Sequence, residues 1–399
     1  MDMHGARRLR GLPRFPMMET RRRAGEARAR GIDVISLGAG EPDRPMAPHV
    51  VAALVRASAD SSTHGYPTGG AWGMPAFRTA VAGRYASRYG VELDPATEVV
   101  ALMGSKEASH HLALALLDAG DVALVPDPGY PAYASNAVLA GAEVWTVPIR
   151  PERDYLVDFD AIPADVARRA RVLWLSYPNN PTAAVAPLDF YATAVAFARR
   201  NDVLLVSDNP YSEIAFDGVV PPSILEIEGA KDVAIEFNSL SKTYNMAGLR
   251  IGMAVGNAEV VAAMAAVKEH VDCGPFDAVQ YAGIAALDGP QDVIEQNAAV
   301  YARRRAIAMD GLMAAGLRAS TPSATFYVWA QVPDGMSSAE FAQSLLDRTG
   351  VAVIPGSAYG GGGEGHVRIS LAVADERLRE AMGRLVAVSD RLRVVPSAD

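Results

Sequence analysis

Cysteine, lysine and long apolar runs are scarce in this sequence of 399 residues. The single cysteine, Cys273, excludes an internal disulfide framework and any metal site built from cysteine alone. A membrane-spanning helix needs about 18 consecutive apolar residues, and the sequence has no such run. The formal net charge of -9 gives no reason to expect binding to nucleic acid or to an acidic membrane. These absences leave a globular, enzyme-sized protein as the expectation.

The shortage of lysine singles out a few candidates for chemistry. Lysine occupies positions 106, 231, 242 and 268, whereas lysine and arginine together number 37. A GC-rich coding bias accounts for the excess of arginine. Each remaining lysine is therefore a candidate for a role that arginine cannot fill, because a lysine amine can lose its proton and attack a carbonyl group.

The first residues, MDMHGARRLRGLPRF, carry charge with no apolar stretch behind it. This pattern is not that of a secretory signal, and it lacks the serine richness of an organellar presequence. We therefore expect a cytoplasmic protein.

Short apolar segments alternate with helical patterns from about residue 98 onward. Continuous apolar runs are typical of strands buried on both faces, and their alternation with helices favours a mainly parallel sheet. We expect strands at 98–103, 121–125, 143–147, 171–176, 203–207, 233–237 and 250–255.

The pattern changes after residue 257, where helices dominate as far as about residue 312. Short strands are expected at 324–330, 351–354 and 366–371, and a closing helix at 375–389. The sequence thus predicts a large α/β domain at 49–290 and a small α+β domain at 291–399. The N-terminal segment, 1–48, has no sheet of its own and is expected to pack with the small domain.

Polar side chains follow one predicted strand in a pattern that suits a phosphate. Ser239, Ser241 and Lys242 come directly after strand 233–237, and Arg250 follows. Ligands of open α/β sheets bind beyond the carboxyl ends of the strands. Hydroxyl and guanidinium groups are good phosphate partners, and a lysine there could form a Schiff base. The alternative is a serine-rich loop with a solvated lysine.

Asp208 ends another apolar strand, and Tyr211 lies three residues further on. A buried carboxylate needs a partner, such as a protonated pyridine nitrogen. The alternative is an Asx turn before Pro210.

Three further motifs are weaker when taken singly. Ser105 and Lys106 begin a predicted helix, whose N-terminus can bind phosphate. Tyr130 offers an aromatic face to a planar ligand. Asn180 belongs to the turn YPNNPT, which also follows a strand.

Several other chemistries find no support in the sequence. The motif Gly38-Ala39-Gly40 is followed by Asp43 where the dinucleotide fingerprint requires glycine. His110 and His111 are adjacent and cannot share a helix face as metal ligands do, so no metal site is expected.

The motifs in this order resemble the fold-type I pyridoxal-phosphate enzymes of the class I/II aminotransferase family, and most closely the LL-diaminopimelate aminotransferase type. The resemblance runs from about Gly11 to Leu385. It rests on GSKEASHHLALALLDAGD, VPDPGYPAY, YPNNPT, SLSKTYNMAGLRIGMAVGN, ATFYVWAQVP and GEGHVRISL. It implies a large doubly wound, mainly parallel sheet domain with a smaller α+β domain. It also implies pyridoxal 5'-phosphate as cofactor and transfer of an α-amino group between an amino acid and a 2-oxo acid.

The resemblance assigns roles residue by residue. Lys242 matches the lysine that holds the cofactor as a Schiff base and moves the proton at the substrate α-carbon. Asp208 matches the acid that keeps the pyridine nitrogen protonated. Tyr130 matches the aromatic residue that stacks on the ring, and Asn180 and Tyr211 match partners of its hydroxyl. The phosphate would be bound by Ser105, Lys106, Ser239, Ser241 and Arg250.

Three matches concern the substrate and the assembly. Arg368 matches the arginine that binds the substrate α-carboxylate, with Asn180 and the backbone of Gly40 beside it. Tyr66 matches a tyrosine that reaches the phosphate of a neighbouring subunit, which implies a homodimer with shared sites.

The departures from the family pattern lie at the distal end of the substrate. Phe15 replaces a tyrosine, and His270 replaces an asparagine. Trp72 stands in a segment about two residues longer than its counterpart, and Ala183 replaces a glycine. Because unpaired polar groups are costly, such changes alter specificity and argue against diaminopimelate itself. We expect Phe15, Trp72 and His270 to contact a bulky distal group.

Three alternatives remain open at this point. The same quinonoid chemistry could serve β/γ-elimination, replacement or carbon–carbon bond formation in specialised biosynthesis. The fold also occurs in ligand-sensing modules fused to DNA-binding domains, although about ten residues precede the family-like segment here. A nicotinamide oxidoreductase is disfavoured by the missing glycine fingerprint.

Overall fold

The structure is a computed structural model and describes residues 6, 8, 9, 12 and 16–392. Its central sheet has seven strands. Their spatial order is β2 (Val99–Leu102), β8 (Gly252–Gly256), β7 (Ala234–Ser239), β6 (Leu204–Asp208), β5 (Ala170–Leu175), β3 (Val122–Asp127) and β4 (Glu143–Pro148). Strand β8 runs antiparallel to both of its neighbours, and the remaining pairs are parallel. The expectation of a mainly parallel sheet is confirmed.

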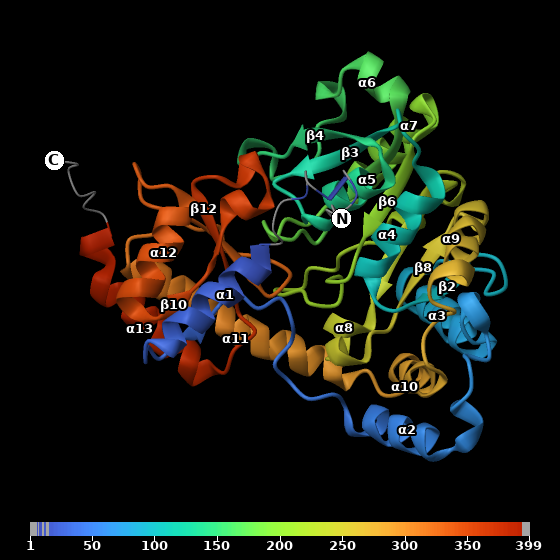
Figure 1. The fold of residues 1–399 in the computed structure, drawn as a ribbon, viewed down its shortest axis with the longest axis horizontal. Helices are drawn as coiled ribbons and strands as arrows, with labels where there is room; N and C mark the ends of the chain where they lie inside the picture. The colour runs from blue at the N-terminus through green and yellow to red at the C-terminus, as the bar shows by residue number, and fades with distance from the viewer. Residues whose placement is uncertain (1–5, 7, 10–11, 13–15, 393–399) are drawn as a thin grey trace, which may run out of the picture.

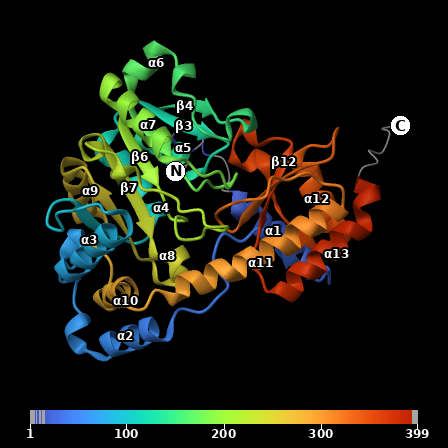
Figure 2. The same cartoon turned by 180° about the vertical axis from the view of Figure 1, so that it is seen from behind.

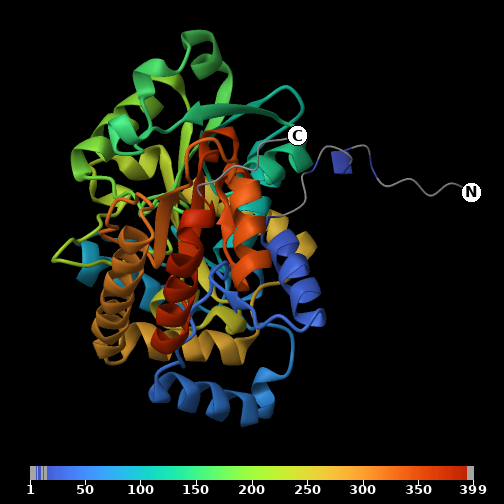
Figure 3. The ribbon, with the colours of Figure 1, turned by 90° about the vertical axis from the view of Figure 1, so that its left-hand side faces the viewer.

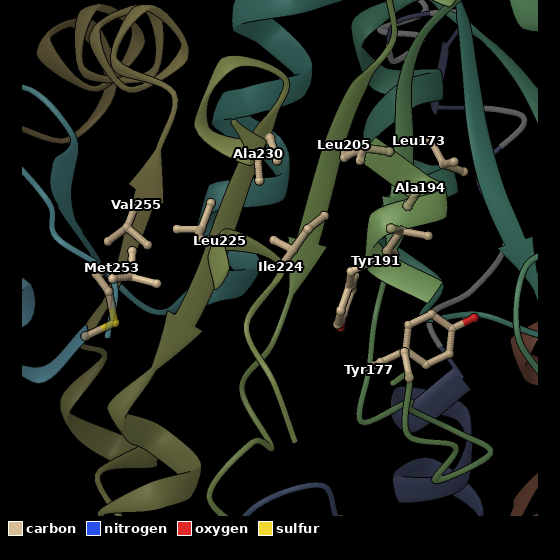
Figure 4. Close-up of a cluster of buried hydrophobic side chains, with 14 of the residues drawn as sticks. Leu173, Tyr177, Tyr191, Ala194, Leu205, Ile224, Leu225, Ala230, Met253 and Val255 are labelled. Atoms are coloured by element: carbon tan, nitrogen blue, oxygen red, sulfur yellow. The ribbon is translucent and has the colours of Figure 1, made fainter. Parts of the chain in front are cut away.

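Alternate side chains of the inner strands enter two separate apolar clusters. Leu173 of β5 and Leu205 of β6 lie in one cluster, part of which Figure 4 shows, with side chains of α7 against the strands. Trp174 and Val206 lie in the other cluster. Because side chains alternate between the faces of a strand, both faces of the sheet are covered.

Two sets of helices provide that cover. The first cluster includes side chains of α3 (Pro75–Tyr89), α7 (Leu188–Asn201) and α10 (Asp277–Asp288). The second includes side chains of α4 (Ser105–Leu116), α5 (Ala132–Ala140) and α9 (Ala258–Val271). Helix α2 (Pro48–Ala59) packs on the outside of α10, as Figures 1 and 2 show. The shorter helices α6 (Ala164–Arg169) and α8 (Leu240–Thr243) also stand between strands of the central sheet along the chain.

Strand β4 differs from the expectation that every strand is buried on both faces. It forms an edge of the sheet and pairs with β3 alone. Most of its side chains are exposed or half-buried, and Trp145 remains 38% exposed. An edge strand has no neighbour on one side, so its apolar sequence does not guarantee burial.

A second, three-stranded antiparallel sheet is built from the C-terminal part of the chain. Its order is β11 (Ile354–Pro355), β12 (His366–Ser370) and β9 (Tyr327–Gln331). The helices α11 (Asp292–Ala314), α12 (Ser338–Thr349) and α13 (Asp375–Leu392) belong to this part. Figure 3 shows these orange and red elements standing in front of the central sheet.

The segment 351–354 is divided between two sheets, where one strand was expected. Residues of β10 (Val351–Ala352) pair in parallel with β1 (Ile35–Ser36), while β11 joins the three-stranded sheet. Helix α1 (Pro16–Ala29) packs against α12. The elements β1 and α1 therefore contact C-terminal elements, while the division into 1–48, 49–290 and 291–399 stays a prediction.

Helix α11 runs from the neighbourhood of α8 and α10 to that of α13 and so connects the two parts of the chain, as Figure 2 shows. No helix among residues 16–392 is both long and apolar enough to cross a membrane.

Candidate active site

A cavity of about 230 Å³ lies beyond the carboxyl ends of the central strands, between the two sheets. The carboxyl ends of these strands lie side by side because their pairing is parallel: Asp208 of β6 pairs with Phe237 of β7, and Ser207 of β6 pairs with Leu175 of β5. The segments that leave these strands therefore begin side by side. The cavity is lined by twelve of the residues predicted from sequence: Gly40, Ser105, Lys106, Tyr130, Asn180, Asp208, Tyr211, Ser239, Ser241, Lys242, Arg250 and Arg368.

Asp208 is the last residue of β6 and is 7% exposed. One carboxylate oxygen, Oδ2, accepts a hydrogen bond of 2.5 Å from the Tyr133 hydroxyl, and the other, Oδ1, is buried with no hydrogen-bond partner. Burial raises the pKa of this carboxyl to about 6. An orphaned carboxylate oxygen facing a cavity fits a cationic N–H donor such as a protonated pyridine nitrogen.

Tyr133 was missed by the sequence analysis, although it stands three residues after Tyr130 in the same motif. Its ring stacks on Trp174 with centroids 4.5 Å apart and meets Tyr130 edge-on at 5.5 Å. This packing fixes the hydroxyl that holds Asp208. The helical spacing of the two tyrosines is the signal that could have found it.

Lys242 lies in the four-residue helix α8, directly after β7. Its ammonium donates a hydrogen bond to the carbonyl of Gly40, and its Nζ atom lies 5.8 Å from the centre of the Phe326 ring. Burial lowers the pKa of this ammonium to about 8. A lysine with that pKa has a substantial neutral fraction near neutral pH, as a nucleophilic amine requires.

One end of the cavity collects groups that suit a phosphate. Ser105 and Lys106 belong to the first turn of α4, where the positive end of the helix dipole favours an anion. The Ser239 hydroxyl accepts a hydrogen bond from the backbone N–H of Ser241. The Arg250 guanidinium donates to the Met103 carbonyl at 3.1 Å.

Gly104 precedes α4 with a φ of 87°, and a Cβ there would lie 2.5 Å from Nη2 of Arg250. Glycine is therefore required where the guanidinium passes.

Arg368 of β12 enters the cavity from the second sheet and is 2% exposed. Its guanidinium donates to Asn180 Oδ1 at 2.8 Å and to the Gly38 carbonyl at 3.0 Å, and Nε has no hydrogen-bond partner. Within residues 16–392 no carboxylate forms an ion pair with it. A buried guanidinium without an anion of its own fits a carboxylate ligand.

Aromatic rings surround this guanidinium. Its central carbon lies 4.0 Å from the Tyr327 ring centre and 5.3 Å from that of Tyr359. The Tyr327 hydroxyl is 3.0 Å from that of Tyr211, and a Cβ on Gly40 would lie 2.8 Å from it. Tyr327 and Tyr359 were not predicted from sequence, because their place beside Arg368 depends on the pairing of β9 with β12 and on the loop before β12.

Four predicted residues do not line this cavity. Tyr66 is 91% exposed, His270 is exposed near the end of α9, and Trp72 is half-buried under the Arg78 guanidinium. Phe15 lies outside the described residues.

The segments that carry Tyr66, Trp72 and His270 are neighbours on one surface. Thr68 donates hydrogen bonds to Asp277, and α9 packs against the short helix Gly70–Trp72. Exposed apolar side chains, Val271, Phe276 and Tyr281, lie in the same region. The roles predicted for these residues in a binding site stay predictions.

Comparison with known proteins is consistent with this geometry. The family model "Aminotransferase class I and II" matches residues 32–385. An LL-diaminopimelate aminotransferase of Dehalococcoides mccartyi is 50% identical over 380 residues, which cover 95% of this chain and 97% of that relative. The enzyme of the same name from Moorella thermoacetica is 49% identical, with 96% and 98% covered.

Solved structures show the same fold. Substrate-bound BacF of Bacillus subtilis is 39% identical and superposes with a TM-score of 0.93, covering 98% of each chain. Aspartate aminotransferase of Thermus thermophilus with maleate is 33% identical with a TM-score of 0.89, covering 97% of this chain and all of the other. The fold-type I architecture expected from the motifs is confirmed, and amino-group transfer is supported over the alternative reactions. The chain belongs to the class I and II aminotransferase family and is a pyridoxal-phosphate-dependent aminotransferase.

Proposed function

We propose that Lys242 is the residue that bonds the cofactor and that Asp208 and Arg368 orient the cofactor ring and the substrate. Two features of one cavity carry this proposal: a lysine amine whose pKa is lowered to about 8 and a buried carboxylate with an unpaired oxygen. When bound, pyridoxal phosphate supplies an electron sink for the pair of electrons left at the substrate α-carbon.

Different residues of the chain have different roles around the bound cofactor. Asp208, held by Tyr133, would keep the ring nitrogen protonated through its unpaired Oδ1. Tyr130 would cover the ring, and Asn180 and Tyr211 would hold its hydroxyl. The phosphate would be bound by Ser105, Lys106, Ser239, Ser241 and Arg250. Lys242 would move the proton at the α-carbon of the substrate.

Arg368 is well placed for the α-carboxylate of the amino acid and of the 2-oxo acid. Asn180 Oδ1 and the Gly38 carbonyl accept hydrogen bonds from its two terminal nitrogens, so the guanidinium group is oriented before the substrate binds. The Tyr327 and Tyr359 rings exclude water from it.

We further propose a homodimer with shared sites. Tyr66, Trp72 and His270 lie outside the cavity of their own chain on a surface with exposed apolar side chains. A second copy placed over that surface would receive them at its own cavity, with Tyr66 at the phosphate.

The substrate side chain is proposed to meet residues of the partner subunit. Relatives named LL-diaminopimelate aminotransferase suggest an amino acid with a polar distal end. Trp72 and His270 instead favour a bulky aromatic or heteroaromatic group, through stacking and a hydrogen bond.

Lys242→Ala is expected to abolish turnover while the protein still binds the cofactor through its phosphate, because the amine that attacks the carbonyl is lost. Borohydride reduction of wild-type holoenzyme, followed by peptide mass analysis, should place the label on Lys242. The matched control, Lys231→Ala, removes an exposed lysine paired with Glu98 and should retain both turnover and label. Labelling of Lys106 in the wild type would contradict the assignment.

Mixed dimers test the shared site. A Tyr66→Phe chain combined with a Lys242→Ala chain should regain part of the activity, because one of the two hybrid sites contains both intact groups. Co-expression with two affinity tags isolates the mixed dimer, and each homodimeric variant is the control. If each chain builds a complete site from its own residues, mixing will restore nothing.

His270→Ala is expected to lower kcat/KM at least tenfold for the true substrate while cofactor affinity stays unchanged, since a distal hydrogen bond is lost. The measurement is a panel of amino donors that includes LL-diaminopimelate and aromatic amino acids. His366→Ala, on β12 and outside the lining of the cavity, is the matched control. Unchanged selectivity in Phe15→Ala, Trp72→Ala and His270→Ala would place the substrate determinants elsewhere.

A further inference from the structure

The proposed mechanism uses neither Lys231 nor Lys268, and of these two Lys268 is buried, with 0% exposure in the last turn of α9. Its ammonium lies 2.5 Å from Glu107 Oε1 and 3.0 Å from Asp272 Oδ1. His111 closes the group, with Nδ1 at 3.3 Å from Glu107 and Nε2 at 3.4 Å from Asp272. We call these four residues the Lys268 network.

The network contains side-chain types that bind metals, and one ligand atom each of Glu107, His111 and Asp272 lies within 4.8 Å of the others. The Lys268 ammonium already contacts both carboxylates and supplies the positive charge there. We therefore interpret the group as an ion-pair network.

On one side the network reaches the residues proposed to bind phosphate. Glu107 Oε2 accepts a hydrogen bond of 2.9 Å from the backbone N–H of Met103. The carbonyl of the same Met103 accepts the hydrogen bond from Arg250. Glu107 and Arg250 therefore contact the two peptide groups that flank the Cα atom of Met103. Ser105 and Lys106 lie between Met103 and Glu107 in the chain.

On the other side the network reaches the outer surface. Asp272 Oδ1 accepts a hydrogen bond of 2.7 Å from the backbone N–H of Gly274. A Cβ on Gly274 would lie 2.3 Å from the Gly70 carbonyl, so this turn packs tightly against the segment that carries Trp72. His270 lies between Lys268 and Asp272.

The ammonium is the group on which this arrangement depends. Without it, the mostly buried carboxylates of Glu107 and Asp272 would lose the one cation that contacts both and would keep only His111 between them, which is unfavourable. Glu107 would then turn toward solvent and release the Met103 N–H.

We propose that Lys268 is a positioning residue for the cofactor phosphate. Its ammonium keeps the Glu107 carboxylate in the position where it accepts the hydrogen bond from the Met103 N–H. This hydrogen bond fixes the first turn of α4 and the Met103 carbonyl that Arg250 contacts. This inference rests on the proposed binding of phosphate by Ser105, Lys106 and Arg250.

The test measures binding of inorganic phosphate to the full-length apoenzyme by calorimetry. Lys268→Met keeps the length of the side chain without its charge, and it should weaken phosphate binding about tenfold, a difference of about 1.4 kcal/mol. Pyridoxal phosphate affinity should fall by a similar factor, while pyridoxal, which has no phosphate, should bind as to the wild type. A purely structural defect would weaken both forms alike.

Two further variants separate position from charge. Lys268→Met combined with Glu107→Gln should recover phosphate affinity to within about threefold of the wild type, because an amide oxygen accepts the Met103 N–H without needing an ammonium beside it. Lys231→Met breaks a half-exposed ion pair with Glu98 and should leave phosphate affinity unchanged. Wild-type phosphate affinity in folded Lys268→Met, or no recovery in the folded double variant, overturns the proposal.

The remaining outcomes are also decisive. If Lys268→Met does not fold, two single variants of Glu107 replace it. Glu107→Gln should keep the wild-type phosphate affinity, and Glu107→Leu should bind phosphate about tenfold more weakly. Equal phosphate affinities in these two variants overturn the proposal. Arg250→Leu tests the site itself. Undiminished phosphate binding in Arg250→Leu means that the proposed phosphate site is wrong. Loss in Arg250→Leu together with full binding in Lys268→Met means that only the role of Lys268 is wrong.

Discussion

Two buried charges of opposite sign, those of Asp208 and Arg368, face one cavity, and neither has an ion-pair partner among residues 16–392. Burying a charge without a counter-charge is costly, so the fold must hold these groups in place by other contacts. Tyr133 and its stacking on Trp174 hold Asp208, while Asn180 and the Gly38 carbonyl hold Arg368. We propose that the cofactor ring and the substrate carboxylate are the ligands whose charges complete this arrangement. Lys242, whose pKa burial lowers, lines the same cavity.

The sequence revealed the parts of the site that follow strand ends. Asp208, Lys242 and Asn180 each stand directly after an apolar run, and the parallel register then brings such positions to one edge. It did not reveal Tyr327 or Tyr359, because contacts between separate parts of the chain have no local pattern. The exposure of β4 was missed for a similar reason: an apolar strand at a sheet edge looks the same in sequence as one in the middle. The buried Lys268 also gave no local signal beyond the rarity of lysine.

The structure places the residues predicted for the site on two separate surfaces of the chain. Residues proposed to contact the cofactor line the cavity of their own chain. Tyr66, Trp72 and His270 gather instead on a neighbouring outer surface, which carries two of the departures from the family pattern, Trp72 and His270. Gly274 packs against Gly70, and Asp272 belongs to the Lys268 network. A chain of direct contacts therefore connects that surface to the first turn of α4. Trp72 and His270 therefore lie outside the cavity, and the Lys268 network lies between their segments and the first turn of α4.

The central claim is that Asp208 is a buried carboxyl whose charge is completed by the cofactor ring. Infrared titration of the carboxylic acid band tests this most directly, with Asp208→Asn to assign the signal. In the apoenzyme the band should appear as pH falls through about 6, because burial disfavours the charged carboxylate and raises its pKa. Loading with pyridoxal phosphate should remove the band at pH 5, since a protonated ring nitrogen stabilises the carboxylate and lowers that pKa. A band that persists at pH 5 after loading, or that remains in Asp208→Asn, would contradict the account.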